Sequence, residues 1–379
     1  MAYKVRFVNP QKHYQEHRKE YLAAINNVLA RGDLILRKDV EDFEKKFASL
    51  IGVKYAVGLN SGTDALFFAL IAAGIKPGDE VITVAHTFVA SVAAIAHLKA
   101  NPVLVDVGED FLIDTDKIEK AITKKTKAIM PVHLNGRVCD MEKIMKIAKK
   151  YNLAIIEDAA QAIGAKYKGK MAGSFGLAGC FSMYPFKILG AFGDAGALTT
   201  NNKELAEKIR LLRDHCQKTL EGSRQVGTYG AGKTELVCYG FNSRLDNLQA
   251  AVLNVKLKFL PKWIKRRRGI ANLYYQGLLG VSRIKLPPKS DKNHFDTYQN
   301  YVILAQKRDK LYSYLKEKGV ETLIKDPIAL HRQKPLKLSH FLLPVTEKLA
   351  EEVISLPCYP ELKNNEVKYT IDCIKRFYA

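Results

Sequence analysis

Long apolar segments and paired cysteines are missing from this sequence. None of the 379 residues lies in an uninterrupted apolar run close to the roughly eighteen residues that suggest a membrane-spanning helix. The first residues lack the apolar stretch of a secretory signal, so we expect a cytoplasmic protein. The six cysteines form no Cys-x-x-Cys pair and have no histidine cluster beside them. This argues against structural zinc and a disulfide framework, and we expect reduced, mostly buried thiols.

Acidic residues are too few to balance the basic ones. The chain has 60 lysines and arginines against 39 aspartates and glutamates, a formal net charge of +21. The basic residues are spread along the whole chain, with only short runs such as residues 265–268, so we do not expect nucleic-acid binding. The charge suits an anionic small substrate instead. The length and a hydrophobic share of 47% allow two domains with a large core.

Short β-branched runs alternate with helical patterns over the first 250 residues. The helical patterns place apolar residues on one face, for example at Val40, Phe43 and Phe47. The strand-like runs recur roughly every twenty-five residues, the spacing of βαβ units; they are 55–59, 80–84, 102–107, 127–134 and 153–157. The sequence therefore predicts an α/β fold with a mostly parallel sheet between helices.

The pattern changes in the later part of the chain. Residues 196–200 are consistent with an added antiparallel strand, and the polar, Gly-rich stretch 217–235 suggests a mobile loop near a site. A long helix over 248–260 leads to a second unit, with a strand at 297–305 and helices at 311–318 and 367–377. We expect a large domain over 1–250 and a smaller C-terminal α/β domain over 251–379.

Two segments at the ends of predicted strands could contact a flat, phosphorylated ligand. Residues 60–66, Asn-Ser-Gly-Thr-Asp-Ala-Leu, place a glycine turn and hydroxyl groups at the start of an apolar helix, where free N–H groups bind phosphate. A plain helix cap explains the same residues. Phe88 follows the second strand and could stack on a ring, although a core position is the common use of phenylalanine.

Two charged residues at later strand ends add reactive groups. Asp158 ends the fifth strand, where a buried carboxylate needs a partner such as a cationic ring nitrogen; capping of the next helix is the alternative. Lys187 lies between a strand end and a glycine loop, where a lysine with a depressed pKa could form a Schiff base. A surface charge is the ordinary alternative for any one lysine. Together, these four groups are the parts that pyridoxal 5′-phosphate (PLP) requires.

Several of these motifs, in the same order, resemble those of the DegT/StrS family of sugar aminotransferases. The resemblance covers about residues 5–378 and rests on Asn-Ser-Gly-Thr-Asp-Ala-Leu (60–66), Glu-Asp-Ala-Ala-Gln-Ala (157–162), Phe-Ser-Met-Tyr-Pro-Phe-Lys-Ile-Leu-Gly-Ala (181–191), Gly-Asp-Ala-Gly-Ala (193–197), Gly-Phe-Asn-Ser-Arg-Leu (240–245) and Leu-Pro-Cys-Tyr-Pro-Glu-Leu (356–362). It implies a PLP enzyme of fold type I, a homodimer with active sites at the subunit interface.

The resemblance also implies a role for individual residues. Lys187 matches the lysine that forms the Schiff base, and Asp158 matches the partner of the pyridine nitrogen. Phe88 would stack on the ring, and Gln161 would contact the ring hydroxyl. The remaining implied contacts are the phosphate cradle of Gly62, Thr63 and Ser182, a phosphate contact from Asn242 of the neighbouring subunit, and His331 near the substrate.

Three positions depart from the family pattern: Asn135, Ile163 and Ile188 stand where many relatives have Tyr, His and Asn. These departures do not involve the cofactor residues, and they leave the identity of the sugar substrate undetermined.

The reaction that the resemblance implies moves an amino group from L-glutamate to a dTDP- or UDP-linked keto sugar, for deoxyamino-sugar or surface-glycan (lipopolysaccharide, O-antigen) biosynthesis. The His-Leu-x-Gly stretch at 133–136 and Gln161 favour C3 over C4, and aminocyclitol formation is a further possibility.

Two rival functions remain for the same fold. A PLP-dependent sugar dehydratase would carry His where this chain has Lys187, and some such enzymes use cysteines for an iron–sulfur cluster. A non-catalytic sensor or transcription regulator would need a DNA-binding element, and no helix-turn-helix stands apart from the enzyme motifs.

Overall fold

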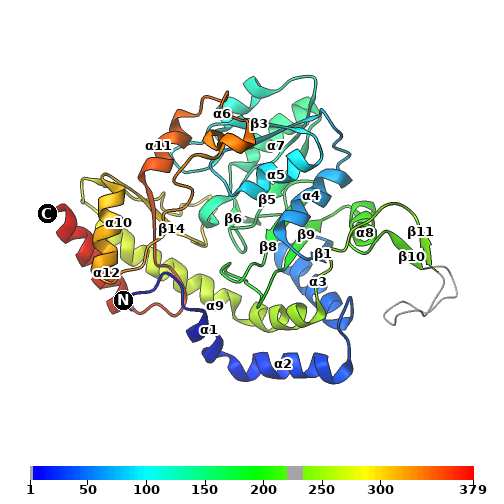
Figure 1. Ribbon diagram of the computed structural model, residues 1–379, viewed down its shortest axis with the longest axis horizontal. Coiled ribbons are helices and arrows are strands. Elements are labelled where there is room, and N and C mark those ends of the chain that lie inside the picture. The colour runs from blue at the N-terminus through cyan, green and yellow to red at the C-terminus, as the bar shows by residue number, and fades with distance from the viewer. Residues whose placement is uncertain (1–2, 220–233) are drawn as a thin grey trace.

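The computed structural model describes residues 3–219 and 234–379. Two bodies of secondary structure share the long helix α9 (Asn247–Leu278), which runs beneath both of them in Figure 1. The larger body holds the main sheet, and the smaller body carries both chain ends beside it. No helix in the described ranges is both long and apolar enough to cross a membrane.

The main sheet has seven strands within the described part of the chain, in the order β1-β9-β8-β5-β4-β2-β3. Every neighbouring pair is parallel except those made by β9, which runs antiparallel to β1 and β8. The predicted mostly parallel sheet is therefore confirmed, as is the antiparallel strand at 196–200. The strands are β1 (Tyr55–Leu59), β2 (Glu80–Val84), β3 (Asn101–Val105), β4 (Thr126–Ile129), β5 (Ala154–Asp158), β8 (Ala178–Ser182) and β9 (Gly196–Thr200).

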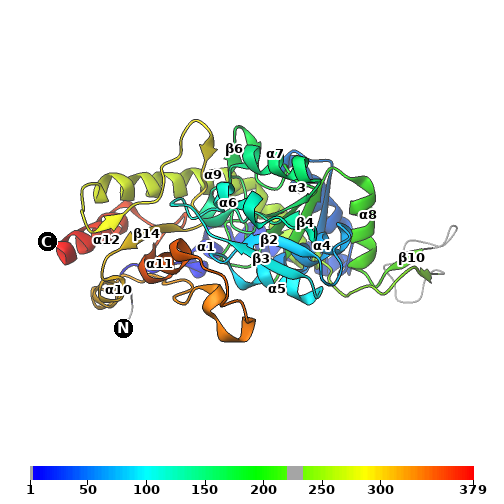
Figure 2. The same cartoon turned by 90° about the horizontal axis from the view of Figure 1, so that it is seen from above.

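Helices cover both faces of this sheet, because its strands are apolar on both sides. One face packs against α3 (Lys38–Ile51), α7 (Met141–Tyr151) and the first part of α9. The other packs against α4 (Gly62–Ala72), α5 (Val89–His97) and α8 (Lys203–Leu212). Figure 2 shows α3 and α7 on one side of the strands and α5 on the other. The predicted apolar face of α3 is confirmed, since Val40, Phe43 and Phe47 are buried.

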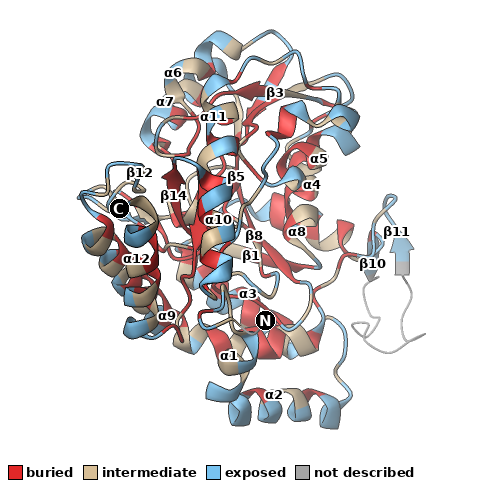
Figure 3. Ribbon diagram, turned by 60° about the vertical axis from the view of Figure 1, so that its left-hand side comes forward, coloured by how far each residue is buried: buried red, intermediate tan, exposed pale blue. Residues whose placement is uncertain are grey.

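The smaller body is a three-stranded antiparallel sheet with its own core. Tyr274, Tyr301 and Val5 are buried in this core, and Figure 3 shows β14 buried behind the exposed outer faces of two helices. The N-terminal segment belongs here, because Val5 N donates to Gly319 O at 3.0 Å. The elements are β12 (Ile284–Lys285), β14 (Tyr301–Ala305), β15 (Val353–Leu356), α10 (Arg308–Glu317) and α12 (Asn364–Tyr378).

Short elements connect and flank the two bodies. Tyr21 on α2 packs against Val252 and Val255 of α9, and β13 pairs with β6 across the two halves of the chain. The elements are α1 (Pro10–Glu16), α2 (Arg18–Arg31), α6 (Thr115–Ile118), α11 (Pro344–Glu352), β6 (Lys166–Tyr167), β7 (Lys170–Met171), β10 (Gln217–Thr219), β11 (Thr234–Leu236) and β13 (His294–Phe295). The expected boundary near residue 250 falls within α9, and the division into domains stays a prediction.

One expectation about the cysteines was wrong. Cys216 and Cys238 form a disulfide across a sequence separation of 22 residues, beside the β10–β11 pair. The two cysteines come together because β10 pairs with β11, and the spacing of the cysteines in the sequence does not reveal that pairing. Within the described ranges the other cysteines are free and buried, as expected. The loop predicted over 217–235 begins and ends in β10 and β11, and its residues 220–233 lie outside the described part.

Candidate active site

A cavity of about 710 Å³ lies between the main sheet and the smaller body. Its sheet side is formed by residues that follow β1, β2, β5 and β8, where these strands end. This is the edge at which open α/β sheets bind ligands. Its other side comes from the N-terminal segment, α9 and the small sheet, through residues such as Phe7, Arg267, Glu321 and Leu356.

The start of α4 forms one end of the cavity. Gly62 and Thr63 line it together with Ser182 at the end of β8. A Cβ on Gly62 would lie 2.7 Å from the Cβ of Ser182, so only glycine allows this close approach. Ser61 is the helix cap, because its Oγ accepts a hydrogen bond from Asp64 N at 3.1 Å. The helix cap is thus Ser61 rather than Gly62 or Thr63, and N–H groups at this helix start can receive an anion.

Lys187 also faces this cavity, from the loop that follows β8. Burial lowers the pKa of its amine to about 8, the nearby Lys325 ammonium lowers it too, and Asp158 raises it. Among the described residues, no carboxylate forms an ion pair with this amine. Gln299 fixes the loop, because its side chain accepts from Ile188 N at 2.9 Å and donates to Phe186 O at 3.0 Å. The side chain of Lys187 therefore lies partly buried in the cavity wall rather than on the open surface.

Asp158 is buried at the end of β5 and lines the same cavity. Its Oδ2 accepts a hydrogen bond from Ser91 Oγ at 2.7 Å, and its Oδ1 accepts one from Ala160 N at 3.2 Å. Ser91 also bonds Thr87 Oγ1 at 2.8 Å. No lysine, arginine or histidine in the described ranges pairs with Asp158, so its negative charge is available to a ligand.

Gln161 is oriented by two asparagines. Its Oε1 accepts hydrogen bonds from Asn135 N at 3.2 Å and from Asn300 Nδ2 at 3.3 Å. With the oxygen occupied, the amide N–H groups of Gln161 remain for a ligand in the cavity. Asn135 and Asn300 also bond each other at 3.2 Å.

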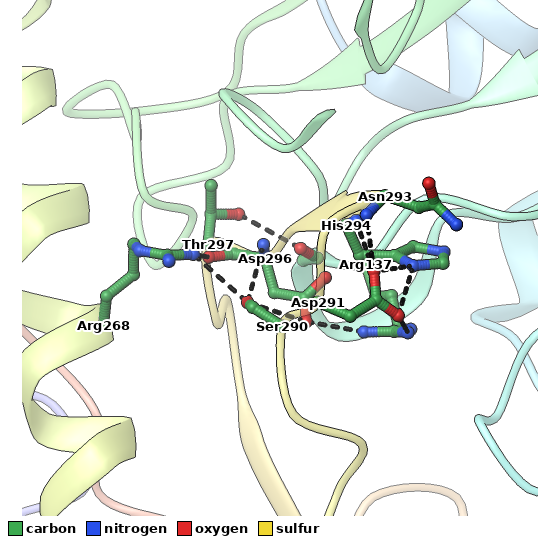
Figure 4. Close-up of polar contacts among 9 residues, drawn as sticks. Arg137, Arg268, Ser290, Asp291, Asn293, His294, Asp296 and Thr297 are labelled. Atoms are coloured by element: carbon green, nitrogen blue, oxygen red, sulfur yellow. Dashed lines mark hydrogen bonds and ion pairs between the residues drawn. The ribbon is translucent and has the colours of Figure 1, made fainter. Parts of the chain in front are cut away.

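A polar network fixes the segment that precedes Asn300 in the sequence (Figure 4). Arg137 donates to Asp296 Oδ2 at 2.7 Å, and Arg268 on α9 donates to Asp296 O at 2.7 Å and to Ser290 Oγ at 3.2 Å. Thr297 N then donates to Gly136 O at 2.9 Å. These bonds join the small body to the loop after β4, and so bring two distant parts of the chain to one cavity wall.

Phe88 lines the cavity with 56% of its surface exposed, which is unlike a core phenylalanine. Two other predicted residues lie elsewhere. His331 is buried, bonds Glu347 Oε1 at 3.0 Å and does not line the cavity; Asn242 is exposed and does not line it either. The assigned roles of all these residues stay predictions. Sequence reasoning missed Ser91, Asn300 and Lys325, because nothing in their local patterns marks them.

Known proteins resemble this chain over its whole length. The model of the DegT/DnrJ/EryC1/StrS aminotransferase family matches residues 15–375. The dTDP-3-amino-3,6-dideoxy-α-D-galactopyranose transaminase of Aneurinibacillus thermoaerophilus is 43% identical, over 98% of this chain and 99% of that protein. A protein of Geobacillus stearothermophilus named pleiotropic regulatory protein is 42% identical, over 96% of both.

Solved structures of other proteins resemble the fold of this chain over most of its length. DesV of S. venezuelae superposes with a TM-score of 0.92 at 38% identity, covering 100% of this chain and 99% of that one. NtdA of Bacillus subtilis, solved with bound pyridoxamine phosphate (PMP), has a TM-score of 0.89 at 33% identity, covering 100% and 86%.

Proposed function

Because this chain belongs to the DegT/DnrJ/EryC1/StrS aminotransferase family, we propose that it moves the amino group of L-glutamate onto a dTDP- or UDP-linked keto sugar. The chain is a PLP-dependent nucleotide-sugar aminotransferase, and the finer identities of donor, sugar and carbon are proposals. One observation carries the site assignment: Lys187, with a lowered pKa, shares a cavity with a glycine cradle and an unpaired buried carboxylate.

The residues of the cavity fit PLP. Gly62, Thr63 and Ser182 would hold the phosphate, because they line the end of the cavity at the start of α4. Asp158 would hold the proton of the ring nitrogen, and Gln161 would donate to the ring hydroxyl. Phe88 exposes a large apolar surface that a stacked ring would cover.

PLP, when bound, supplies an electron sink for the carbon that gains or loses the amino group. The chain supplies the acid–base chemistry. Lys187 can take a proton from the reacting carbon of the amino donor and deliver a proton to the reacting carbon of the keto sugar, because its pKa of about 8 leaves both forms accessible near neutral pH. Asp158 would place its carboxylate against the ring nitrogen, in a cavity whose walls come from both bodies.

We assign the amination to C3 of the sugar. Names of similar proteins support this, such as the dTDP-3-amino-3,6-dideoxy-α-D-galactopyranose transaminase. The net charge of +21 suits a substrate that carries a diphosphate. We further propose that the enzyme acts in the cytoplasm, in amino-sugar biosynthesis for surface glycans such as O-antigen.

We also propose a homodimer in which Asn242 of one subunit reaches the phosphate in the other. Asn242 is exposed on its own subunit, and exposed apolar residues precede it: Leu236 is 70%, Tyr239 101% and Phe241 40% exposed. Apolar surface of this kind supports contact with a second copy. His331 stays a weaker candidate for a substrate contact.

Incubation with L-glutamate and a panel of dTDP- and UDP-linked keto sugars, followed by mass spectrometry, tests the function. We expect exchange of a keto oxygen for an amino group, with formation of 2-oxoglutarate, and loss of this product in Lys187→Ala. Loss of a hydroxyl group from the sugar would favour the dehydratase. DNA binding in physiological salt with no transamination would favour the regulator.

A further inference from the structure

Lys325 is a second lysine in the wall of the active-site cavity, and the proposed reaction does not use it. It comes from the smaller body, on the segment between α10 and α11, and it lines the cavity together with Lys187. About a third of its side chain, 30%, is exposed, although burial lowers the pKa of its amine. Its Nζ lies 5.9 Å from the centre of the Phe88 ring.

Lys325 lacks the hydrogen bonds that two buried cations of this chain, Arg308 and Lys256, donate. Arg308 donates to the backbone oxygens of Ala350 and Val353, each at 3.1 Å, and Lys256 donates to Gly190 O. No hydrogen bond from the Lys325 amine is present among the described residues. Its one ion pair there is a 3.9 Å contact with Asp326, an exposed neighbour. Burial lowers the pKa of the Lys325 amine, and the carboxylates of Asp326 and Asp158 raise it. Neither carboxylate accepts a hydrogen bond from the amine among the described residues, so the ammonium group can bind an anion from outside the chain.

The anion must lie close to the reacting nitrogen. The charge of Lys325 is near enough to lower the pKa of Lys187, and Lys325 also lies beside Phe88 in the same wall. A carboxylate on the carbon that carries the amino group, or close to it, would lie there. The phosphates of a nucleotide sugar and the C6 carboxylate of a 3-keto sugar acid are both separated from C3 by part of the sugar ring, so the carboxylate of an amino donor fits this position best.

We propose that Lys325 binds a carboxylate of the substrate beside the carbon that exchanges its amino group. This proposal rests on the proposed aminotransferase function. Two substrates can supply this carboxylate: the amino donor, through its α-carboxylate, and a keto sugar acid. The α-carboxylate is attached directly to the reacting carbon.

The test compares wild type with Lys325→Gln, Lys325→Arg and a control, Lys318→Gln. Lys318 is an exposed lysine over the ring of Tyr314, 5.2 Å away and outside the cavity. Each protein is converted to its PMP form with L-glutamate or with 4-aminobutyrate, which lacks the α-carboxylate, and the absorbance gives the saturation constant. The PMP form is then reacted with a UDP-linked 3-keto sugar that carries or lacks a carboxylate at C6.

We expect Lys325→Gln to raise the saturation constant about 10- to 100-fold for the member of one pair that carries the tested carboxylate, and not for the member that lacks it. The affected pair identifies the source of the carboxylate. Lys325→Arg should retain most of the affinity, and Lys318→Gln should match wild type. A change in the pKa of Lys187 would affect both members of each pair equally, so it cannot produce this difference. Equal effects within both pairs would overturn the proposal.

Calorimetric titration with glutarate gives a readout that does not need turnover. Wild type should bind glutarate about tenfold more tightly than Lys325→Gln. Equal glutarate affinity, together with equal effects of Lys325→Gln within the keto-sugar pair, would refute the role of Lys325. Tighter binding by wild type without any transamination would instead refute the proposed function and leave the carboxylate site standing.

Discussion

Replacing Asp158 by asparagine removes one negative charge from the cavity while keeping its shape. The amide oxygen of Asn can still accept the hydrogen bond that Ser91 donates at 2.7 Å, so we expect the fold and cofactor binding to persist. Two opposite unit charges about 4 Å apart attract by about 4 kcal/mol at an effective dielectric constant of about 20. That energy corresponds to about three pKa units of the ring nitrogen and, if fully expressed in the transition state, to about a thousandfold in rate.

The assay mixes holoenzyme rapidly with saturating L-glutamate in the absence of sugar and follows the visible absorbance of the cofactor. We expect Asp158→Asn to slow this half-reaction by a factor on the order of a thousand. The control is Asp116→Asn, which removes an equal charge at an exposed ion pair with Lys143, where little effect is expected. A decrease smaller than about tenfold would refute the ion-pair role, since it leaves under 1.4 kcal/mol for the interaction.

Three further predictions concern cofactor binding and assembly. Cofactor-free protein should capture PLP faster as pH rises through about 8, because only the neutral Lys187 amine attacks the aldehyde; a flat stopped-flow profile between pH 6.5 and 9.5 would contradict this. Gly62→Ala should weaken PLP binding in equilibrium titrations by about tenfold or more through the 2.7 Å clash with Ser182, whereas Gly269→Ala, with open space at its Cβ, should not. After subunit exchange, an equal mixture of the Lys187→Ala and Asn242→Ala proteins should regain about a quarter of wild-type activity if Asn242 acts across subunits, because half of the dimers then hold one intact site; exchange without recovery would exclude that.

The large body was predictable because its signals are local. Each parallel strand is a short apolar run, and α3 and α7 carry their buried residues at helical spacing, so the layered architecture follows from periodicity. The disulfide between Cys216 and Cys238 was not predictable, because it depends on how β10 meets β11. The extent of α9, 32 residues, was underestimated because Pro261 and a run of basic residues interrupt its apolar pattern.

The sheet side of the site was predictable for the same reason, since Asp158 and Lys187 follow recognisable strands. The other wall was not. Asn300 reaches Gln161 only because Arg137 and Asp296 join segments far apart in the sequence. A single lysine in a lysine-rich chain carries no mark of its position in three dimensions, so nothing local distinguishes Lys325.

The central claim is that Lys187 is the lysine that binds the cofactor covalently. Borohydride reduction of the holoenzyme fixes the cofactor on its lysine, and peptide mass spectrometry after digestion then locates it. We predict the modification on the peptide that contains Lys187 and on no other. A modified Lys325, or an unmodified Lys187 in protein that retains PLP, would contradict the account.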